Sequence, residues 1–79
     1  MDIVLTDHAV SQMRRRRISL EDTLLVLELG VHVDGLEEGT REACTEVDGR
    51  PITIVYDELE FRFRGTFVIV TVIRRKCRE

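Results

Sequence analysis

The chain has 79 residues, of which 43% are hydrophobic and 34% are charged. This composition predicts a single globular domain over residues 1–79 and is too apolar for a disordered chain. Its apolar runs fall well short of the roughly 20 residues that span a bilayer, and the first residues lack a signal-peptide pattern. We therefore expect a cytoplasmic protein with no membrane partner, in which Cys44 and Cys77 are reduced.

The net charge of −3 hides a segregation of charge along the chain. Residues 1–17 sum to +2, residues 18–60 to −10 and residues 61–79 to +5. Only one of the twelve cations is a lysine, and the planar fork of arginine suits bidentate contacts with phosphate or carboxylate. Two interpretations remain open, an anionic ligand or internal ion pairs between the acidic middle and the basic ends.

A short strand and a helix are expected first. The β-branched run at residues 3–5 predicts the strand, and the N-cap oxygens that follow it predict a helix over residues 8–17. At 100° per residue, Ala9 and Met13 share the apolar side of this helix. The opposite side carries the polar residues His8, Gln12 and Arg15. We therefore expect an amphipathic helix whose side opposite the apolar residues is cationic.

A second helix is expected over residues 20–29, because Ser19 and Asp22 form a capping-box pattern at its start. Leucine and valine occupy most of the circumference of this helix. Either other parts of the chain bury it on two sides, or its outer face is available for self-association. Gly30 follows the helix. We expect this glycine to end the helix in the left-handed conformation.

The first strands of a sheet are expected after the second helix. Residues 31–33 form a short strand, and residues 40–47 lead into Asp48-Gly49, a dipeptide typical of a tight hairpin turn. The returning strand covers residues 52–56. This part of the chain therefore predicts an antiparallel pair.

The remaining residues also predict strands. Leu59, Phe61 and Phe63 alternate with charged residues, which indicates a strand with one solvent-exposed face. Gly65 then marks a bulge or turn. Residues 66–73 are almost continuously β-branched, which is typical of a strand buried on both faces. The predicted fold class is α+β, with a short N-terminal strand, two helices on one sheet face, and an antiparallel β-meander. The functional chemistry is then expected on the other sheet face.

Several short motifs are spread over nearly the whole chain. They are His8-Ala9, Met13, Arg16, Ile18-Ser19, Asp48-Gly49-Arg50-Pro51-Ile52 and Val70-Thr71-Val72. Together they resemble a large bacterial and archaeal family of small proteins whose pattern reads His-Ala, Arg-Met, then Arg-Gly-Ile-Ser. The chain departs from that pattern at Gln12, where the family has arginine, and at Arg17, where it has glycine. The family is similar to the RelE/BrnT/MqsR-type toxin superfamily.

This resemblance implies a RelE-like sandwich and a toxin of a type II toxin–antitoxin pair. The toxin would be an mRNA endoribonuclease that needs no metal or other cofactor and is held inactive by a small cognate antitoxin. Metal-free RNA cleavage requires a proton-transfer group at the ribose and cationic donors at the phosphate. The residues expected to be catalytic are His8, Arg16 and Arg74. Those expected to bind RNA are Gln12, Arg15, Tyr56, Arg62, Arg64 and Lys76.

Structural roles are the alternatives for these residues. His8 also suits a helix cap, Tyr56 also suits a half-buried position in the sheet, and a charged C-terminus also keeps an edge strand soluble. Two alternatives to a nuclease therefore remain. One is a non-catalytic RNA- or protein-binding module of the same fold. The other is an interaction unit that forms a homodimer through a strand edge or the second helix.

Overall fold

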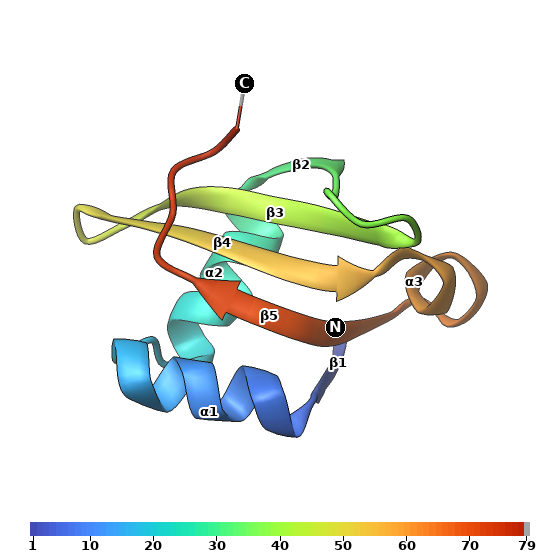
Figure 1. Cartoon of the computed structure of the whole chain (residues 1–79), viewed down its shortest axis with the longest axis horizontal. Helices are drawn as coiled ribbons and strands as arrows, with labels where there is room; N and C mark the ends of the chain where they lie inside the picture. Colours follow the sequence, from blue (N-terminus) through green and yellow to red (C-terminus); the bar gives the residue numbers. More distant parts are fainter. Residues whose placement is uncertain (79) are drawn as a thin grey trace.

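The computed structural model describes residues 1–78, which form three helices and one five-stranded sheet (Figure 1). The elements are β1 (Asp2–Leu5), α1 (Asp7–Arg16), α2 (Leu20–Leu29), β2 (Val31–Asp34), β3 (Thr40–Val47), β4 (Arg50–Asp57), α3 (Glu58–Arg64) and β5 (Thr66–Ile73). The strand order is β1-β5-β4-β3-β2. Strands β2 to β5 form the expected antiparallel meander, and β1 pairs in parallel with β5. The predicted α+β fold class is confirmed.

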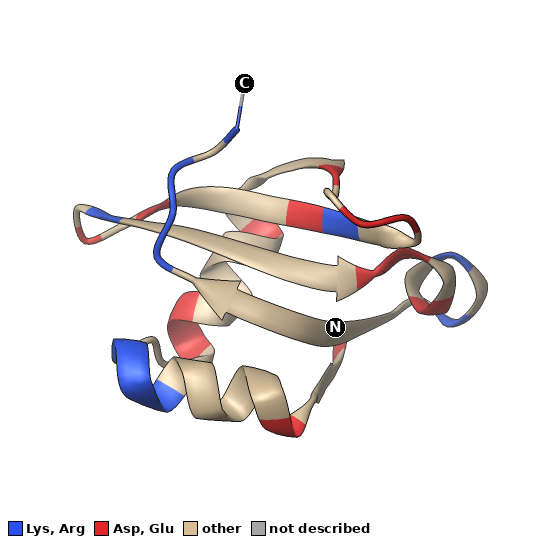
Figure 2. Cartoon of the chain, viewed as in Figure 1, with Lys and Arg blue, Asp and Glu red and all other residues tan. Residues whose placement is uncertain are grey.

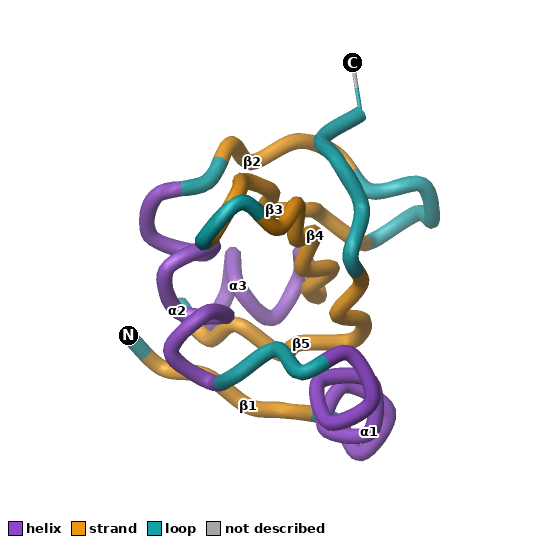
Figure 3. The backbone as a smooth tube through the Cα atoms, turned by 90° about the vertical axis from the view of Figure 1, so that its left-hand side faces the viewer, coloured by secondary structure: helices purple, strands orange, loops and turns teal. Residues whose placement is uncertain are grey.

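The sheet has a core face and an open face, because side chains alternate along each strand. On β4, Ile52, Ile54 and Tyr56 are buried on the core face. Figure 3 shows α2 on one side of β3 and β4 and the C-terminal residues 74–78, here called the tail, on the other. The open face is the face that the tail crosses. No helix within residues 1–78 covers the open face, so it is the face on which the sequence predicts the functional chemistry.

Helix α1 covers the part of the β5 edge that β1 does not reach. The backbone N–H of Thr6 donates to the Ile69 carbonyl at 3.2 Å, and the backbone N–H of Val72 donates to Oε1 of Gln12 at 2.8 Å. These bonds satisfy edge groups of β5 that would otherwise be unpaired. Gln12 is buried, so the prediction that it lies on the outer side of α1 is wrong. The helix packs against a strand edge, and its contact surface is broader than one apolar stripe.

The caps of α1 and α2 follow the sequence prediction, whereas the end of α2 does not. The hydroxyl of Thr6 accepts from the Ala9 N–H at 3.1 Å, and the capping box of α2 is present. Gly30 is extended, with φ of −75°, so the predicted left-handed conformation is wrong. A Cβ atom at Gly30 would lie 2.4 Å from the Val26 carbonyl oxygen and 2.9 Å from that of Cys44. Glycine is therefore needed for the close approach of α2 to β3.

Residues 58–64 form α3, so the strand predicted from the alternation of aromatic and charged residues is wrong. The Asp57 side chain accepts from the Glu60 N–H at 2.9 Å and caps the helix, and Gly65, with φ of 67°, ends it. Phe61 packs against Phe67 with ring centroids 4.5 Å apart. Two i,i+4 ion pairs follow the outer surface of the helix, Glu58–Arg62 and Glu60–Arg64. Acids in the first turn and arginines in the last also suit the helix dipole.

The core lies between the core face of the sheet and the helices. Its fully buried side chains include Tyr56, Ile52, Ile54, Ile69, Val26 and Val72. None of the helices within residues 1–78 has the length and apolar character needed to cross a membrane. Helix α2 contributes Val26 and Leu27 to the core, while Leu25 and Leu29 remain exposed.

Candidate functional site

Groups of basic residues lie at the C-terminal end of α1, along the tail and on α3, and single arginines lie in β3 and at the start of β4 (Figure 2). The first two are neighbours, because the bond from Val72 to Gln12 fixes the last turns of α1 beside the end of β5. Helix α3 lies at the opposite end of the sheet. Arg62 and Arg64 are therefore separated from Gln12 and Arg15 of α1, while Tyr56, at the end of β4, lies close to α3.

Half of the cations are bonded to carboxylates, so internal ion pairs account for part of the arginine content. The pairs within residues 1–78 are Arg41–Asp34, Arg50–Asp22, Arg62–Glu58, Arg64–Glu60, Arg75–Glu42 and Arg78–Glu42. Exposed pairs such as those on α3 contribute little to stability. Their main effect here is to neutralise the arginines locally.

The other six cations form what we call the basic end. They are Arg14, Arg15, Arg16, Arg17, Arg74 and Lys76. None of them pairs with a carboxylate in the part of the chain that the structure describes. Nη1 of Arg16 is buried without a hydrogen-bond partner, so this guanidinium has an unused donor. An arrangement of this kind favours an anionic ligand.

Arg50 fixes the backbone at Arg17, the last of the four arginines at the end of α1. Its guanidinium donates to the Arg17 carbonyl and to the Asp22 carboxylate, each at 2.8 Å. The pKa of Asp22 is lowered, first by the backbone N–H of Ser19 and then by Arg50. Asp22 is therefore ionised and engaged by its own partners. Arg17 itself has a left-handed φ of 55°, a conformation that glycine adopts more easily.

His8 lies apart from the basic end. It is exposed in the first turn of α1, eight residues before Arg16. At 1.5 Å per residue, that separation is about 12 Å along the helix axis. The structure thus brings Arg16 and Arg74 to one end of the molecule but does not bring His8 to them. The catalytic role of His8, Arg16 and Arg74 therefore stays a prediction.

Tyr56 belongs to the core instead of the expected RNA-contacting surface. It is 2% exposed, and its hydroxyl lies 2.8 Å from Nδ1 of His32. The other ring nitrogen of His32 lies 2.9 Å from the Leu27 carbonyl oxygen. Tyr56 also packs edge-on against Phe67, with centroids 4.9 Å apart. Because the ring is enclosed on the core face, no base can stack on it in this conformation.

A disulfide bond between Cys44 and Cys77 fastens the tail to the open face. The prediction of reduced thiols is therefore wrong for this structure. The two residues are 33 positions apart, yet their Cα atoms lie 5.4 Å from each other. Cys44 pairs with Thr53 across β3 and β4, and the Thr53 hydroxyl donates to the Arg75 carbonyl at 2.8 Å. The tail thus crosses β4 and reaches β3, which the linear spacing of the cysteines did not reveal.

Glu42 is a buried carboxylate on the open face, and the sequence analysis did not identify it. Only 3% of the residue is exposed, and both Arg75 and Arg78 bond to its Oε1 atom. A buried carboxylate is stable only when it is paired or hydrogen-bonded. The tail supplies these partners, so Glu42 and the tail form one structural unit. A lone glutamate in a strand gives no sequence signal for such a role.

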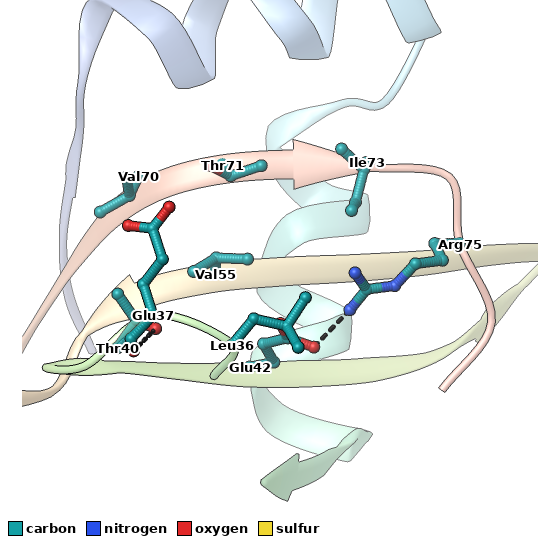
Figure 4. Close-up of a pocket in the computed structure, with 9 residues that line it drawn as sticks. All are labelled: Leu36, Glu37, Thr40, Glu42, Val55, Val70, Thr71, Ile73 and Arg75. Carbon is teal, nitrogen blue, oxygen red and sulfur yellow. Dashed lines mark hydrogen bonds and ion pairs between the residues drawn. The ribbon is translucent and has the colours of Figure 1, made fainter. Parts of the chain in front are cut away.

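A pocket of about 210 Å³ lies beside this unit on the open face (Figure 4). It is lined by Leu36, Glu37, Thr40, Glu42, Val55, Val70, Thr71, Ile73 and Arg75. Figure 4 shows the Arg75–Glu42 pair at one end and Glu37 with Thr40 at the other. The walls between them are formed by apolar side chains of β4 and β5. Its charged lining residues are Glu37, Glu42 and Arg75, and the rest are aliphatic residues and threonines.

Comparison with known proteins finds no matching family model, curated protein or solved structure. Among residues 1–78, no group of three or more His, Cys, Asp or Glu side chains is placed to hold a metal ion. Geometry and charge are therefore the basis for assigning a function.

Proposed function

We propose that this protein is a non-catalytic module that binds the phosphate backbone of RNA through its basic end. The observation that carries the proposal is the contrast between the two sets of cations. Six cations are bonded to acids, and of the six without a carboxylate partner within residues 1–78, four lie at the end of α1 and two, Arg74 and Lys76, lie in the tail that follows β5. Arginine, which makes up most of the basic end, favours phosphate contacts.

Binding of this kind depends strongly on salt. Each phosphate that a cation neutralises releases a counterion, and the slope of log K against log salt is about −0.7 per contact for a single strand. Six contacts would set an upper limit of about −4 for the slope. The basic end offers no aromatic side chain for reading a base. We therefore expect affinity with little sequence preference.

The position of His8 favours this module over the nuclease that the sequence resemblance implies. A general acid or base acts within hydrogen-bond reach of its proton, about 3 Å, or through one water molecule. The axial separation of about 12 Å between the backbones of His8 and Arg16 leaves the imidazole two helical turns away from this arginine. A phosphate bound at Arg16 would come within reach of His8 only if both side chains extended toward it.

Two double variants test the proposal by fluorescence anisotropy with a labelled single-stranded RNA. Arg14→Gln/Arg15→Gln removes two exposed cations from the basic end, and Arg62→Gln/Arg64→Gln removes two exposed cations from α3 as the matched control. We expect the first variant to bind about tenfold more weakly, with a salt slope less steep by about 1.4, and the control to bind within twofold of wild type. Equal losses in both variants would contradict the proposal.

The nuclease alternative is tested with the same RNA. We expect the strand to remain intact after prolonged incubation with the wild-type protein. Cleavage products that disappear in a His8→Ala variant would overturn the non-catalytic assignment and support an endoribonuclease.

A further inference from the structure

The tail is an extended, basic segment already seated on the open face. Two of its arginines, Arg75 and Arg78, are spaced three residues apart and share the Glu42 carboxylate. The Arg78 guanidinium also donates to the Asp34 carbonyl at 2.8 Å. The open face therefore contains a site that binds both arginines of an Arg-x-x-Arg segment, and the chain's own residues occupy it.

The charge of the open face matches such a segment. Glu42 and Glu46 lie on the same side of β3 as Cys44, and Glu37 lies in the adjoining pocket. Between the acids, Val55 and Ile73 provide apolar surface for the stems of long side chains. The planar fork of arginine suits a buried carboxylate better than the point charge of lysine does. This surface therefore suits a basic peptide better than an acidic one.

The disulfide is the one covalent bond that holds the tail in place. The remaining contacts are a few hydrogen bonds and two ion pairs made by a short terminal segment, whose ordering is opposed by conformational entropy. Cys77 is exposed, whereas Cys44 is buried. A thiol from solution can therefore reach the Cys77 sulfur.

We propose that the open face around Glu42 is a docking site for an arginine-bearing, extended segment of a partner protein, and that the disulfide between Cys44 and Cys77 controls access to it. While the disulfide is intact, the tail fills the site. When a dithiol reduces the bond, the tail can leave and a partner segment with the Arg-x-x-Arg spacing takes its place.

The redox step is a thiol–disulfide exchange that needs a dithiol as reductant. The dithiol's thiolate attacks Sγ of Cys77, the bond to Cys44 breaks, and Cys44 leaves as a thiolate that takes up a proton. The second thiol of the reductant then displaces Cys77 and closes the reductant's own disulfide. Two electrons and two protons pass to the chain in total, and the dithiol is oxidised by the same amount.

The docking site does not depend on the proposed RNA binding, because its acids lie on the open face and not at the basic end. Its test uses no RNA. A failure of peptide docking would leave the RNA proposal unchanged, and a failure of RNA binding would leave the docking site unchanged.

The experiment measures binding of a fluorescent peptide, Arg-Arg-Lys-Ser-Arg, which is the tail sequence with serine in place of Cys77. Because the tail belongs to the same chain as the site, it competes with the peptide at a high effective concentration. The sharpest comparison therefore uses a variant whose tail can no longer bind Glu42. We expect the variant Arg75→Ser/Cys77→Ser/Arg78→Ser to bind the peptide at least tenfold more tightly than the oxidised wild type. Wild type reduced with dithiothreitol should fall between the two. Equal affinity of the triple variant and the oxidised wild type would overturn the proposal.

Two controls separate specific docking from attraction between net charges. A peptide with both spaced arginines replaced by lysine has the same charge and should bind the triple variant at least fivefold more weakly. Adding Glu42→Gln to the triple variant should lower the affinity for the original peptide at least tenfold, while circular dichroism confirms that it folds. Equal binding of the arginine and lysine peptides would overturn the proposal even if the Glu42→Gln protein failed to fold.

Discussion

The two faces of the sheet are stabilised by different interactions. On the core face, residues such as Ile54 are fully buried among apolar side chains. On the open face, the buried residues include Glu42 and Cys44, which hold the tail through ion pairs and a disulfide. Apolar burial is non-directional and tolerates many partners, whereas a buried ion pair requires one geometry. The comparison indicates that apolar packing on the core face determines the fold and that specific polar and covalent contacts on the open face hold the tail.

The largest difference between the faces is expected at two neighbouring residues of β4. Ile54→Ala removes a fully buried side chain from the core face and should lower the free energy of unfolding by about 4 kcal/mol. Val55→Ala, on the partly exposed open face, should lower it by about 1 kcal/mol. Urea denaturation followed by circular dichroism measures both. Equal losses would mean that the two faces contribute equally to the fold.

The disulfide is the next largest contribution. Cys77→Ser removes a link that closes a loop of 33 residues in sequence separation, and we expect a loss of about 3 kcal/mol in the free energy of unfolding. The far-ultraviolet circular dichroism spectrum should remain that of wild type, because the core face is untouched. A variant that loses its secondary structure would show that the open face is also needed for folding.

The hydrogen bond at the sheet edge tests whether a polar group can be as important as the apolar core. Gln12→Leu removes the acceptor for the Val72 N–H and leaves that buried donor unpaired. We expect a loss of about 2 kcal/mol, measured by thermal or urea unfolding. Gln12→Glu is the matched control, since it keeps an oxygen acceptor at the same position. A leucine variant as stable as wild type would show that water replaces the lost acceptor.

Asp22 provides a smaller effect that depends on pH. Asp22→Asn weakens the bonds to Ser19 and Arg50 and should lower the free energy of unfolding by about 1 kcal/mol at neutral pH. The pKa of Asp22 is lowered in the folded protein, so its contribution is present above the ordinary pKa of 3.8 and is lost as the pH falls through the folded-state value. The difference between wild type and variant should therefore shrink in acid. A constant difference would contradict this assignment.

The smallest effect is expected on α3. Arg62→Ala removes an exposed i,i+4 pair with Glu58 whose atoms lie 3.9 Å apart. The free energy of unfolding should change by about 0.3 kcal/mol, at the limit of a denaturation experiment. A loss above about 1 kcal/mol would show that the exposed pairs of this helix stabilise the fold.

Much of the fold could be predicted because local signals agree with the final structure. The capping box at Ser19 marks the start of α2, and Asp48-Gly49 forms the predicted tight turn, with positive φ at both residues. The strand predicted at residues 59–64 is wrong because the alternation of Phe61 and Phe63 with arginines is not the signal that decides the structure here. The helical signals there are the cap at Asp57 and the i,i+4 spacing of opposite charges. In a segment this short, the helical signals outweigh the alternation of aromatic and charged residues.

The candidate site was less predictable because its contacts join distant parts of the chain. The gathering of Arg16 and Arg74 depends on α1 lying along β5, and no local pattern encodes that pairing. The roles of Glu42 and Cys77 depend on the path of the tail across β4 to β3. The sequence resemblance supplied the positions of the arginines, but the separation of His8 from them could be seen only in three dimensions.

The parallel pairing of β1 with β5 has a consequence for how the protein forms. Asp2 pairs with Thr66, so the first strand remains without its neighbour until β5 has been synthesised. Contacts between such distant segments slow folding, because the loop between them must close first. A nascent chain interrupted before residue 66 would leave β1 unpaired and one edge of β4 open. We expect such fragments to be prone to aggregation and to degradation.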